Sequence, residues 1–272
     1  MTQPSNEYAM GHSDRERRRL MLQAAVQNPM TEQLLRRAGI LAGMRVLDLG
    51  CGVGDVSILA AQLVGRNGSV TGVDLDEGAL AIANARAQEQ GLHQIRFERR
   101  SVEELASSTP YDAVIGRHIL IHTRDPIAVL TQVGSLLRPG GVVAFHEYDF
   151  SVVELAYPPL PAREELARLF TRLLPVPNMG ARLYHCFLKA GFSHPQCQIE
   201  SRIDGGPGSP GYEIFAQAVI SLLPRADAAG IKFSLPRDPD GLRQHLEREA
   251  VESLSSYPMP LTVAGYARRV SP

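Results

Sequence analysis

Two aspartates and three glycines form the group of residues best suited to chemistry in this sequence. The run LDLGCGVGD places Asp48 before Gly50, Gly52 and Gly54, and Asp74 follows about 20 positions after the last glycine. Glycines allow a ligand to approach the backbone closely, and a carboxylate before such a turn suits an ammonium or sulfonium group. A second carboxylate accepts hydrogen bonds from both hydroxyls of a ribose. The group therefore predicts a nucleoside ligand with a cationic tail.

The glycine spacing also argues against another class of ligand. Dinucleotide-binding folds carry G-x-G-x-x-G, which places a pyrophosphate on a helix N-terminus. Here the glycines alternate and an acid precedes them. A nicotinamide-dependent oxidoreductase is therefore disfavoured, and failure to bind NADH would remove it.

The elements that position these residues alternate between strands and helices. Unbroken apolar runs predict strands at 44–49, 69–74, 94–98, 111–116 and 141–147, with helices at about 55–64, 77–90, 102–106 and 125–137. Alternation of this kind predicts a doubly wound, mostly parallel α/β sheet with both faces covered. Ligands of such sheets bind at the carboxyl ends of the strands, which is where the glycine turn falls.

Composition limits the range of partners. The chain has 272 residues, 44% of them apolar, and a net charge of −1, so a sizeable core and no strong field for nucleic acid are expected. The three scattered cysteines, Cys51, Cys186 and Cys197, fit neither a disulfide framework nor a metal site. We expect a cytoplasmic protein with a small-molecule substrate, no bound metal, no nucleic acid and no membrane span; a homodimer is left open.

Four ordered motifs resemble those of the class I S-adenosylmethionine-dependent methyltransferases of the small-molecule, bacterial natural-product branch. They are VLDLGCGVGD at 46–55, VTGVDLDEGAL at 70–80, YDAVIGRHILIH at 111–122 and LLRPGG at 136–141. The resemblance covers about 42–148 and implies a Rossmann-like methyltransferase fold with a seven-stranded sheet. It implies S-adenosyl-L-methionine as cofactor and S-adenosyl-L-homocysteine as product.

The resemblance also assigns cofactor contacts. Asp48 and the turn Gly50, Cys51, Gly52, Gly54 would surround the methionine part, Asp74 would hold the ribose, and Leu75 would pack on the adenine. Ser101 stands where the family commonly has an aspartate for the adenine amino group, with Val102 beside it. Arg117 would lie beside the methionine part. The N-terminal segment adds Tyr8 and Gln23.

The predicted organisation is one catalytic domain with additions. Residues 1–40 form an N-terminal helical cap, with one helix from about 14 to 26 and another at about 31–38. Residues 41–150 form the cofactor-binding core. Residues 151–272 complete the sheet at about 180–203 and 259–269 and insert a helical lid at about 151–179 and 205–256. The strand at 261–269 is expected to be antiparallel at the sheet edge, and the lid is expected to choose the substrate.

Three residues are candidates for acid–base chemistry, which methyl transfer needs only if the acceptor must lose a proton. His146 and Glu147 lie at the carboxyl end of the fifth predicted strand, and His122 follows the fourth, at the rim of the expected cleft. Strand alternation places His146 and Tyr148 on one side and Glu147 on the other, so only one set faces the pocket. His118 is expected to be structural.

The sequence thus predicts methyl transfer to a small, fairly apolar metabolite in specialised metabolism. Two alternatives stay open: a cofactor-binding protein of this fold that transfers no methyl group, and a quinone- or lipid-type C-methyltransferase. Oxygen, nitrogen and carbon acceptors are not distinguished.

Overall fold

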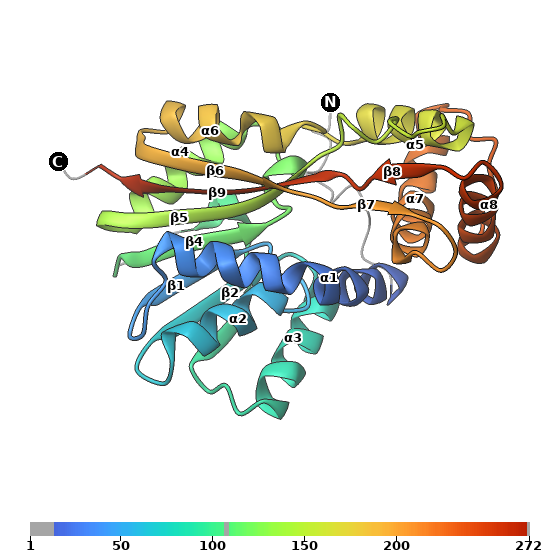
Figure 1. Ribbon diagram of the computed structural model, residues 1–272. Coiled ribbons are helices and arrows are strands. Elements are labelled where there is room, and N and C mark those ends of the chain that lie inside the picture. Colours follow the sequence, from blue (N-terminus) through green and yellow to red (C-terminus); the bar gives the residue numbers. More distant parts are fainter. Residues whose placement is uncertain (1–13, 106–108, 271–272) are drawn as a thin grey trace.

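A computed structural model describes residues 14–105 and 109–270 (Figure 1). Its main sheet has seven strands in the order β3-β2-β1-β4-β5-β9-β6. These strands are β1 (Arg45–Leu49), β2 (Ser69–Asp74), β3 (Ile95–Arg99), β4 (Tyr111–Arg117), β5 (Leu137–Asp149), β6 (Phe192–Glu200) and β9 (Leu261–Arg269). β1 to β5 pair in parallel, whereas β9 pairs antiparallel with both β5 and β6. The predicted doubly wound, mostly parallel sheet is confirmed.

Two expectations about the end of the sheet were wrong. β9 lies inside the sheet, between β5 and β6, and β6 forms the edge (Figure 1). Val263, Ala264 and Ala267 of β9 are buried, which suits an interior strand covered on both faces. The segment at about 180–203 was expected to complete the main sheet up to its end, but β6 ends at Glu200, and β7 (Ile203–Gly205) pairs with β8 (Ser256–Pro258) in a separate two-stranded sheet.

Helices cover both faces of the main sheet. α1 (Asp14–Ala38), α2 (Asp55–Val64) and α3 (Glu77–Glu89) lie with the first strands, and α4 (Pro126–Leu136) and α6 (Met179–Lys189) cover the opposite face (Figure 1). Two short 3-10 turns, η1 (Val102–Glu104) and η2 (Leu120–His122), follow β3 and β4. The two faces have separate buried apolar clusters, as a sheet covered on both sides requires.

The N-terminal region forms one helix, where the sequence predicted two. α1 runs from Asp14 to Ala38 and contains Pro29, a residue that removes a helical hydrogen bond. Ala24 and Gln27 before the proline and Leu34 after it are all buried, whereas Pro29 itself is exposed. Burial of one face along the whole helix outweighs the penalty of the proline on the solvent side.

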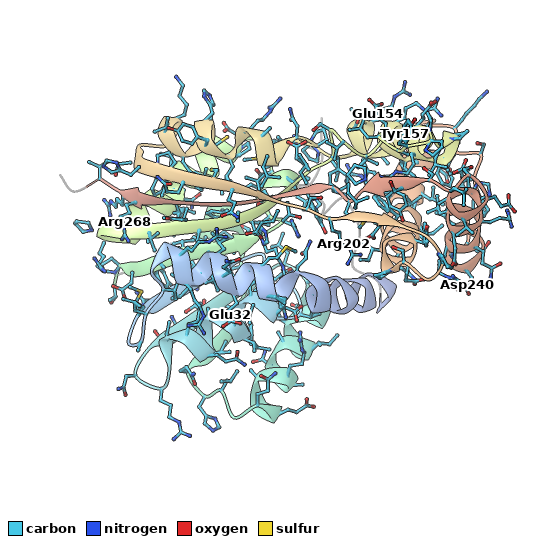
Figure 2. The ribbon with its side chains drawn as sticks, in the orientation of Figure 1. Glu32, Glu154, Tyr157, Arg202, Asp240 and Arg268 are labelled. Carbon is cyan, nitrogen blue, oxygen red and sulfur yellow. The ribbon has the colours of Figure 1, made fainter. Side chains whose placement is uncertain are left out.

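The remaining elements form the lid at one end of the sheet. They are α5 (Pro161–Leu173), α7 (Pro210–Ala228), α8 (Pro239–Glu252) and the β7–β8 sheet. Figure 2 shows Glu154, Tyr157 and Asp240 on this side of the molecule and Arg268 of β9 at the other end. Lid residues such as Leu166 and Val219 belong to the same buried cluster as Val133 of α4. The lid is thus packed as an extension of the sheet's core.

The lid interior also holds a buried arginine. The guanidinium of Arg163 lies 4.4 Å from the ring centre of Phe215 and 4.3 Å from that of Tyr257, and it donates to the carbonyl of Pro258 at 2.9 Å. Burial lowers its pKa to about 10, so the group stays charged at neutral pH. Two aromatic faces thus replace part of the hydration of this cation.

Across the described residues, the structure has no helix long and apolar enough to cross a membrane.

Candidate active site

The glycine turn joins β1 to α2 at the carboxyl end of the sheet. Gly50, Gly52 and Gly54 all have positive φ angles, of 61°, 52° and 85°. A Cβ atom on Gly50 would lie 2.6 Å from Cδ1 of Ile119, and one on Gly54 would lie 2.9 Å from Cβ of Ala83. The protein's own packing therefore requires two of these glycines. The sequence suggested only a ligand as the reason for them.

Asp74, at the end of β2, fixes the turn from the side. Its Oδ2 accepts the backbone N–H of Gly52 at 2.8 Å, and its Oδ1 accepts that of Asp76 at 2.9 Å. Each carboxylate oxygen has a second lone pair, so the group keeps acceptor capacity for ribose hydroxyls. Leu75, the next residue, is 46% exposed. A fixed carboxylate for the ribose with an exposed leucine beside it for the adenine suits a bound adenosine group.

Asp48 is a buried carboxylate with one unpartnered oxygen. Its side chain is 1% exposed, and its Oδ2 accepts the hydroxyl of Ser57 at 2.6 Å. Among the described residues, its Oδ1 has no hydrogen-bond partner. Burial raises the pKa of Asp48 to about 7. An unpaired buried acid of this kind is stabilised by a cation, which is what the ammonium and sulfonium groups of the expected cofactor provide.

Two arginines, one of them not singled out from the sequence, hold the start of α2. Arg86 of α3 donates to the carbonyl of Val53 at 2.5 Å and to the carboxylate of Asp55 at 2.7 Å. Arg117, at the end of β4, lies 3.9 Å from the other oxygen of Asp55 and donates to Thr31 of α1 at 3.2 Å. Arg117 thus joins the glycine turn to α1. No sequence signal pointed to Arg86, because it lies on α3 and only the fold brings it to the start of α2.

The other predicted cofactor contacts are placed as follows. Ser101 follows β3 and its N–H donates to Oε2 of Glu104 at 3.2 Å, which starts the short turn η1. Val102 is partly buried against the core. Cys51 is buried, and burial raises the pKa of its thiol well above the usual range, so it remains protonated. Tyr8 lies outside the described residues; Gln23 lies in α1, but its side chain is not among those described.

The structure places His146 in the interior of the protein. Its ring is 0% exposed, with Nδ1 3.1 Å from the hydroxyl of Thr31 and Nε2 3.6 Å from Oε2 of Glu200 on β6. Glu200 in turn pairs with Arg37 of α1 at 2.7 Å. Burial lowers the pKa of His146, which favours the neutral ring. Because α1 covers this ring, His146 is closed to a substrate. Its contact with Thr31 joins α1 to the sheet.

Glu147 is likewise turned into the protein. Its side chain is 0% exposed and accepts the backbone N–H groups of Ile119, Leu120 and Ile121 at 3.1, 2.8 and 3.2 Å. Burial raises the pKa of this carboxyl to about 8. The predicted alternation of His146 and Glu147 to opposite sides is confirmed, yet neither of these two side chains is exposed to solvent. Glu147 binds backbone and has no exposed surface for a substrate.

Polar side chains with partial exposure gather instead around His118, which follows β4. His118 has a positive φ of 55° and its ring stacks on Tyr148, with centres 3.8 Å apart. The carboxamide of Gln27 bridges the pair, 2.8 Å from Nε2 of His118 and 2.5 Å from the hydroxyl of Tyr148. His122, at the end of η2, is also partly exposed. The predicted structural role of His118 agrees with these contacts.

Comparison with known proteins identifies the family. A family model described as a methyltransferase domain matches residues 40–179, about half of the chain. The ubiquinone biosynthesis O-methyltransferase of Nitrosococcus oceani is 33% identical over 173 residues, which are 63% of this chain and 68% of that relative. The ubiquinone biosynthesis O-methyltransferase of Aeromonas salmonicida is 40% identical over 109 residues, 39% of this chain and 44% of that relative.

Solved structures share the fold at low sequence identity. YcgJ of Bacillus subtilis has a TM-score of 0.59 at 18% identity, covering 89% of this chain and 98% of that one. Phosphoethanolamine N-methyltransferase 2 of Haemonchus contortus, solved with phosphomonomethylethanolamine and S-adenosylhomocysteine, has a TM-score of 0.56 at 20% identity, covering 90% and 52%. The cyclase SpnF has a TM-score of 0.56 at 19% identity, covering 90% and 82%.

The sheet order, the glycine turn and the two acids Asp48 and Asp74 are those of an α/β protein that binds a nucleoside with a cationic tail. The chain belongs to the methyltransferase-domain family and is a class I S-adenosylmethionine-dependent methyltransferase with a small-molecule acceptor. S-adenosylmethionine is its cofactor, and the unpaired Oδ1 of Asp48 is the observation in this structure that fits it. The predictions of fold, enzyme class and cofactor are confirmed.

Proposed function

We propose that this enzyme O-methylates a small hydroxylated aromatic compound of the quinone-precursor type. The single observation that carries the proposed site is the unpaired, buried carboxylate oxygen of Asp48 beside the glycine turn. The acceptor class is supported by the relatives, which are named as O-methyltransferases of ubiquinone biosynthesis. The sequence alone favoured a natural-product metabolite, and its quinone-type alternative was methylation on carbon. The proposal instead takes a quinone-type acceptor that is methylated on oxygen.

In this proposal each part of the site has a separate task. Asp48 binds the cationic methionine end of the cofactor, Asp74 binds the ribose, and Leu75 covers the adenine. Arg117 holds α1 against the start of α2, and so closes the site beside the glycine turn. The cofactor supplies an activated methyl group on sulfonium sulfur. The protein's contribution is to align the acceptor oxygen with that methyl group and to exclude water.

A phenolic acceptor requires a base, because its hydroxyl must lose a proton as oxygen attacks the methyl carbon. We propose His122 for this role. Of the three sequence candidates, it alone is partly exposed, since His146 and Glu147 are fully buried. Its place at the end of η2 puts it on the segment that follows β4, beside the glycine turn of β1. A neutral imidazole can accept a proton, so a histidine side chain is suited to the role of general base.

The test is methyl transfer to a chromophoric diphenol. Purified enzyme with S-adenosylmethionine is expected to convert 4-nitrocatechol to a product heavier by one methyl group, read by mass spectrometry. His122→Asn is expected to lower kcat by about two orders of magnitude without changing the affinity for S-adenosylhomocysteine. His93→Asn is the matched control, because His93 is an exposed histidine just before β3, at the amino edge of the sheet.

Two results would contradict the proposal in different ways. Normal turnover by His122→Asn removes His122 as the base and leaves the reaction standing. Tight binding of S-adenosylhomocysteine with no transfer to any diphenol, amine or carbon acceptor favours a non-transferring role. That alternative has a specific basis, since the fold is shared with the cyclase SpnF and so does not by itself fix the reaction.

A further inference from the structure

Glu147 has an unusual set of partners for a buried carboxylate. Its two oxygens accept three successive backbone N–H groups, those of Ile119 and Leu120 on Oε1 and that of Ile121 on Oε2. Within the described residues, no basic side chain lies within ion-pair distance of it. The ionised form of this buried group is therefore stabilised by backbone hydrogen bonds alone, which hold its pKa down against the effect of burial.

The three N–H groups belong to one short segment, which we call loop 118–122. The loop begins with His118, whose φ of 55° is in the left-handed region that side chains disfavour, and ends with the 3-10 turn η2. A 3-10 turn leaves its first N–H groups without backbone partners. Glu147 satisfies them from the neighbouring strand β5, so it holds the loop in a conformation that the backbone does not favour by itself.

The loop in turn contacts both halves of the proposed site. The side chain of Ile119 lies against the glycine turn, where its Cδ1 fills the space that a Cβ on Gly50 would need, at 2.6 Å. The carbonyl of Ile121 accepts the N–H of Val176, in the lid segment after α5, at 3.3 Å. Ile121 thus gives its N–H to Glu147 and its carbonyl to the lid. One buried carboxylate is the common anchor of these contacts.

We propose that Glu147 is the positioning residue of the cofactor site, holding loop 118–122 so that Ile119 supports the glycine turn and Ile121 connects it to the lid. The inference rests on the proposed placement of the cofactor at that turn. It gives Glu147 a part different from that of a base, because the side chain is fully buried and its oxygens accept the N–H groups of the loop. Its effect on binding passes through the loop.

Two substitutions separate the parts of this anchor. Glu147→Gln keeps the shape but leaves one acceptor oxygen, so its amide group must face at least one loop N–H, donor against donor. Glu147→Ala removes all three acceptors. The affinity for S-adenosylhomocysteine is therefore expected to fall about threefold or more in Glu147→Gln and about tenfold or more in Glu147→Ala, both measured by calorimetric titration at pH 9, above the pKa of about 8 at which Glu147 ionises.

Asp149 provides the matched control. It is a second buried carboxylate on β5, two positions further on, and it accepts the backbone N–H groups of Ser151 at 3.0 Å and Ala181 of α6 at 2.9 Å. It therefore has the same kind of structural task at a different place. Asp149→Asn is expected to lower the Tm, as Glu147→Gln does, and to leave the dissociation constant of S-adenosylhomocysteine unchanged within about twofold.

A spectroscopic reading completes the experiment. In ¹H–¹⁵N spectra of cofactor-free protein at the same pH, where Glu147 is ionised, Glu147→Gln is expected to move the amide resonances of Ile119, Leu120 and Ile121 upfield, whereas Asp149→Asn leaves them in place. Unchanged affinity in Glu147→Gln, with or without these shifts, overturns the proposal, and this reading stands even if Glu147→Ala does not fold. A wild-type enzyme that binds S-adenosylhomocysteine but methylates no diphenol contradicts the proposed acceptor and leaves this inference intact.

Discussion

Asp74 offers the sharpest test of the cofactor site, because its two oxygens are already committed to the backbone around the glycine turn. They accept the N–H groups of Gly52 at 2.8 Å and Asp76 at 2.9 Å. In Asp74→Asn only one acceptor oxygen remains, and the new amide group faces an N–H in either orientation. The variant therefore loosens the turn and also loses the charge that the ribose hydroxyls would meet.

The expected loss of affinity follows from these contacts. A hydrogen bond to a charged group contributes roughly 1.5 to 3 kcal/mol, and about 1.4 kcal/mol corresponds to a factor of ten in affinity. Since Asp74 is only half-buried, we expect the lower part of that range, an affinity for S-adenosylhomocysteine about tenfold weaker. Asp74→Ala, which loses both acceptors, should weaken binding further.

Calorimetric titration with S-adenosylhomocysteine measures this loss, and Asp76→Asn is the control. Asp76 caps α3 by accepting the N–H of Gly78 at 2.9 Å, a task that asparagine performs equally well. The affinity of Asp76→Asn for S-adenosylhomocysteine should stay within about twofold of wild type. If Asp74→Asn also binds S-adenosylhomocysteine normally, the assignment of Asp74 to the ribose is refuted.

Three further perturbations test the burial and packing of the site. Because the pKa of Asp48 is raised from 3.8 to about 7, the native protein binds more protons than the unfolded chain between those values, and the free energy of unfolding falls as pH rises through them. Asp48→Asn should remove this contribution and stabilise the cofactor-free protein at pH 8 by up to about 4 kcal/mol in urea unfolding; an unchanged pH dependence would contradict the assigned burial. Gly54→Ala should destabilise by about 1 to 3 kcal/mol more than Gly91→Ala, since both have positive φ but only a Cβ on Gly54 meets neighbours within 4 Å; equal Tm values would oppose this reading. His146→Ala should lower the free energy of unfolding by about 2 kcal/mol, while kcat per folded molecule stays within about threefold of wild type. A large loss of kcat at unchanged stability would show instead that His146 takes part in catalysis.

Local chemistry explains why much of the fold could be predicted. The range of α2 was predicted without error, since Gly54 precedes it and Gly65 follows it, and β2 ends at Asp74 as the apolar run does. Asp125 caps α4 and Pro126 opens it, as their types indicate. These features depend on residues close together in the chain. α1 was divided in the prediction because Pro29 is a local signal, whereas the burial that keeps the helix continuous comes from the sheet.

Pairing between distant segments was the part that local signals could not supply. β9 has the apolar pattern of any strand, and its interior place depends on β6 pairing on its far side. The split between β6 and β7 likewise depends on β8, more than 50 residues later in the chain. A strand pattern records which residues are buried, and it does not record which neighbour buries them.

The cofactor chemistry of this protein could be predicted from the sequence, because the glycine turn and the acids Asp48 and Asp74 lie in two short motifs whose spacing is set by one strand-helix-strand unit, β1-α2-β2. The roles of two polar residues near the carboxyl end of β5, in contrast, depend on tertiary contacts. His146 and Glu147 look alike as candidate bases in the sequence, yet α1 and β6 enclose the first and the backbone of loop 118–122 binds the second. Whether a titratable group meets solvent or is used up within the protein depends on segments far away in the chain, and only folding brings those segments together.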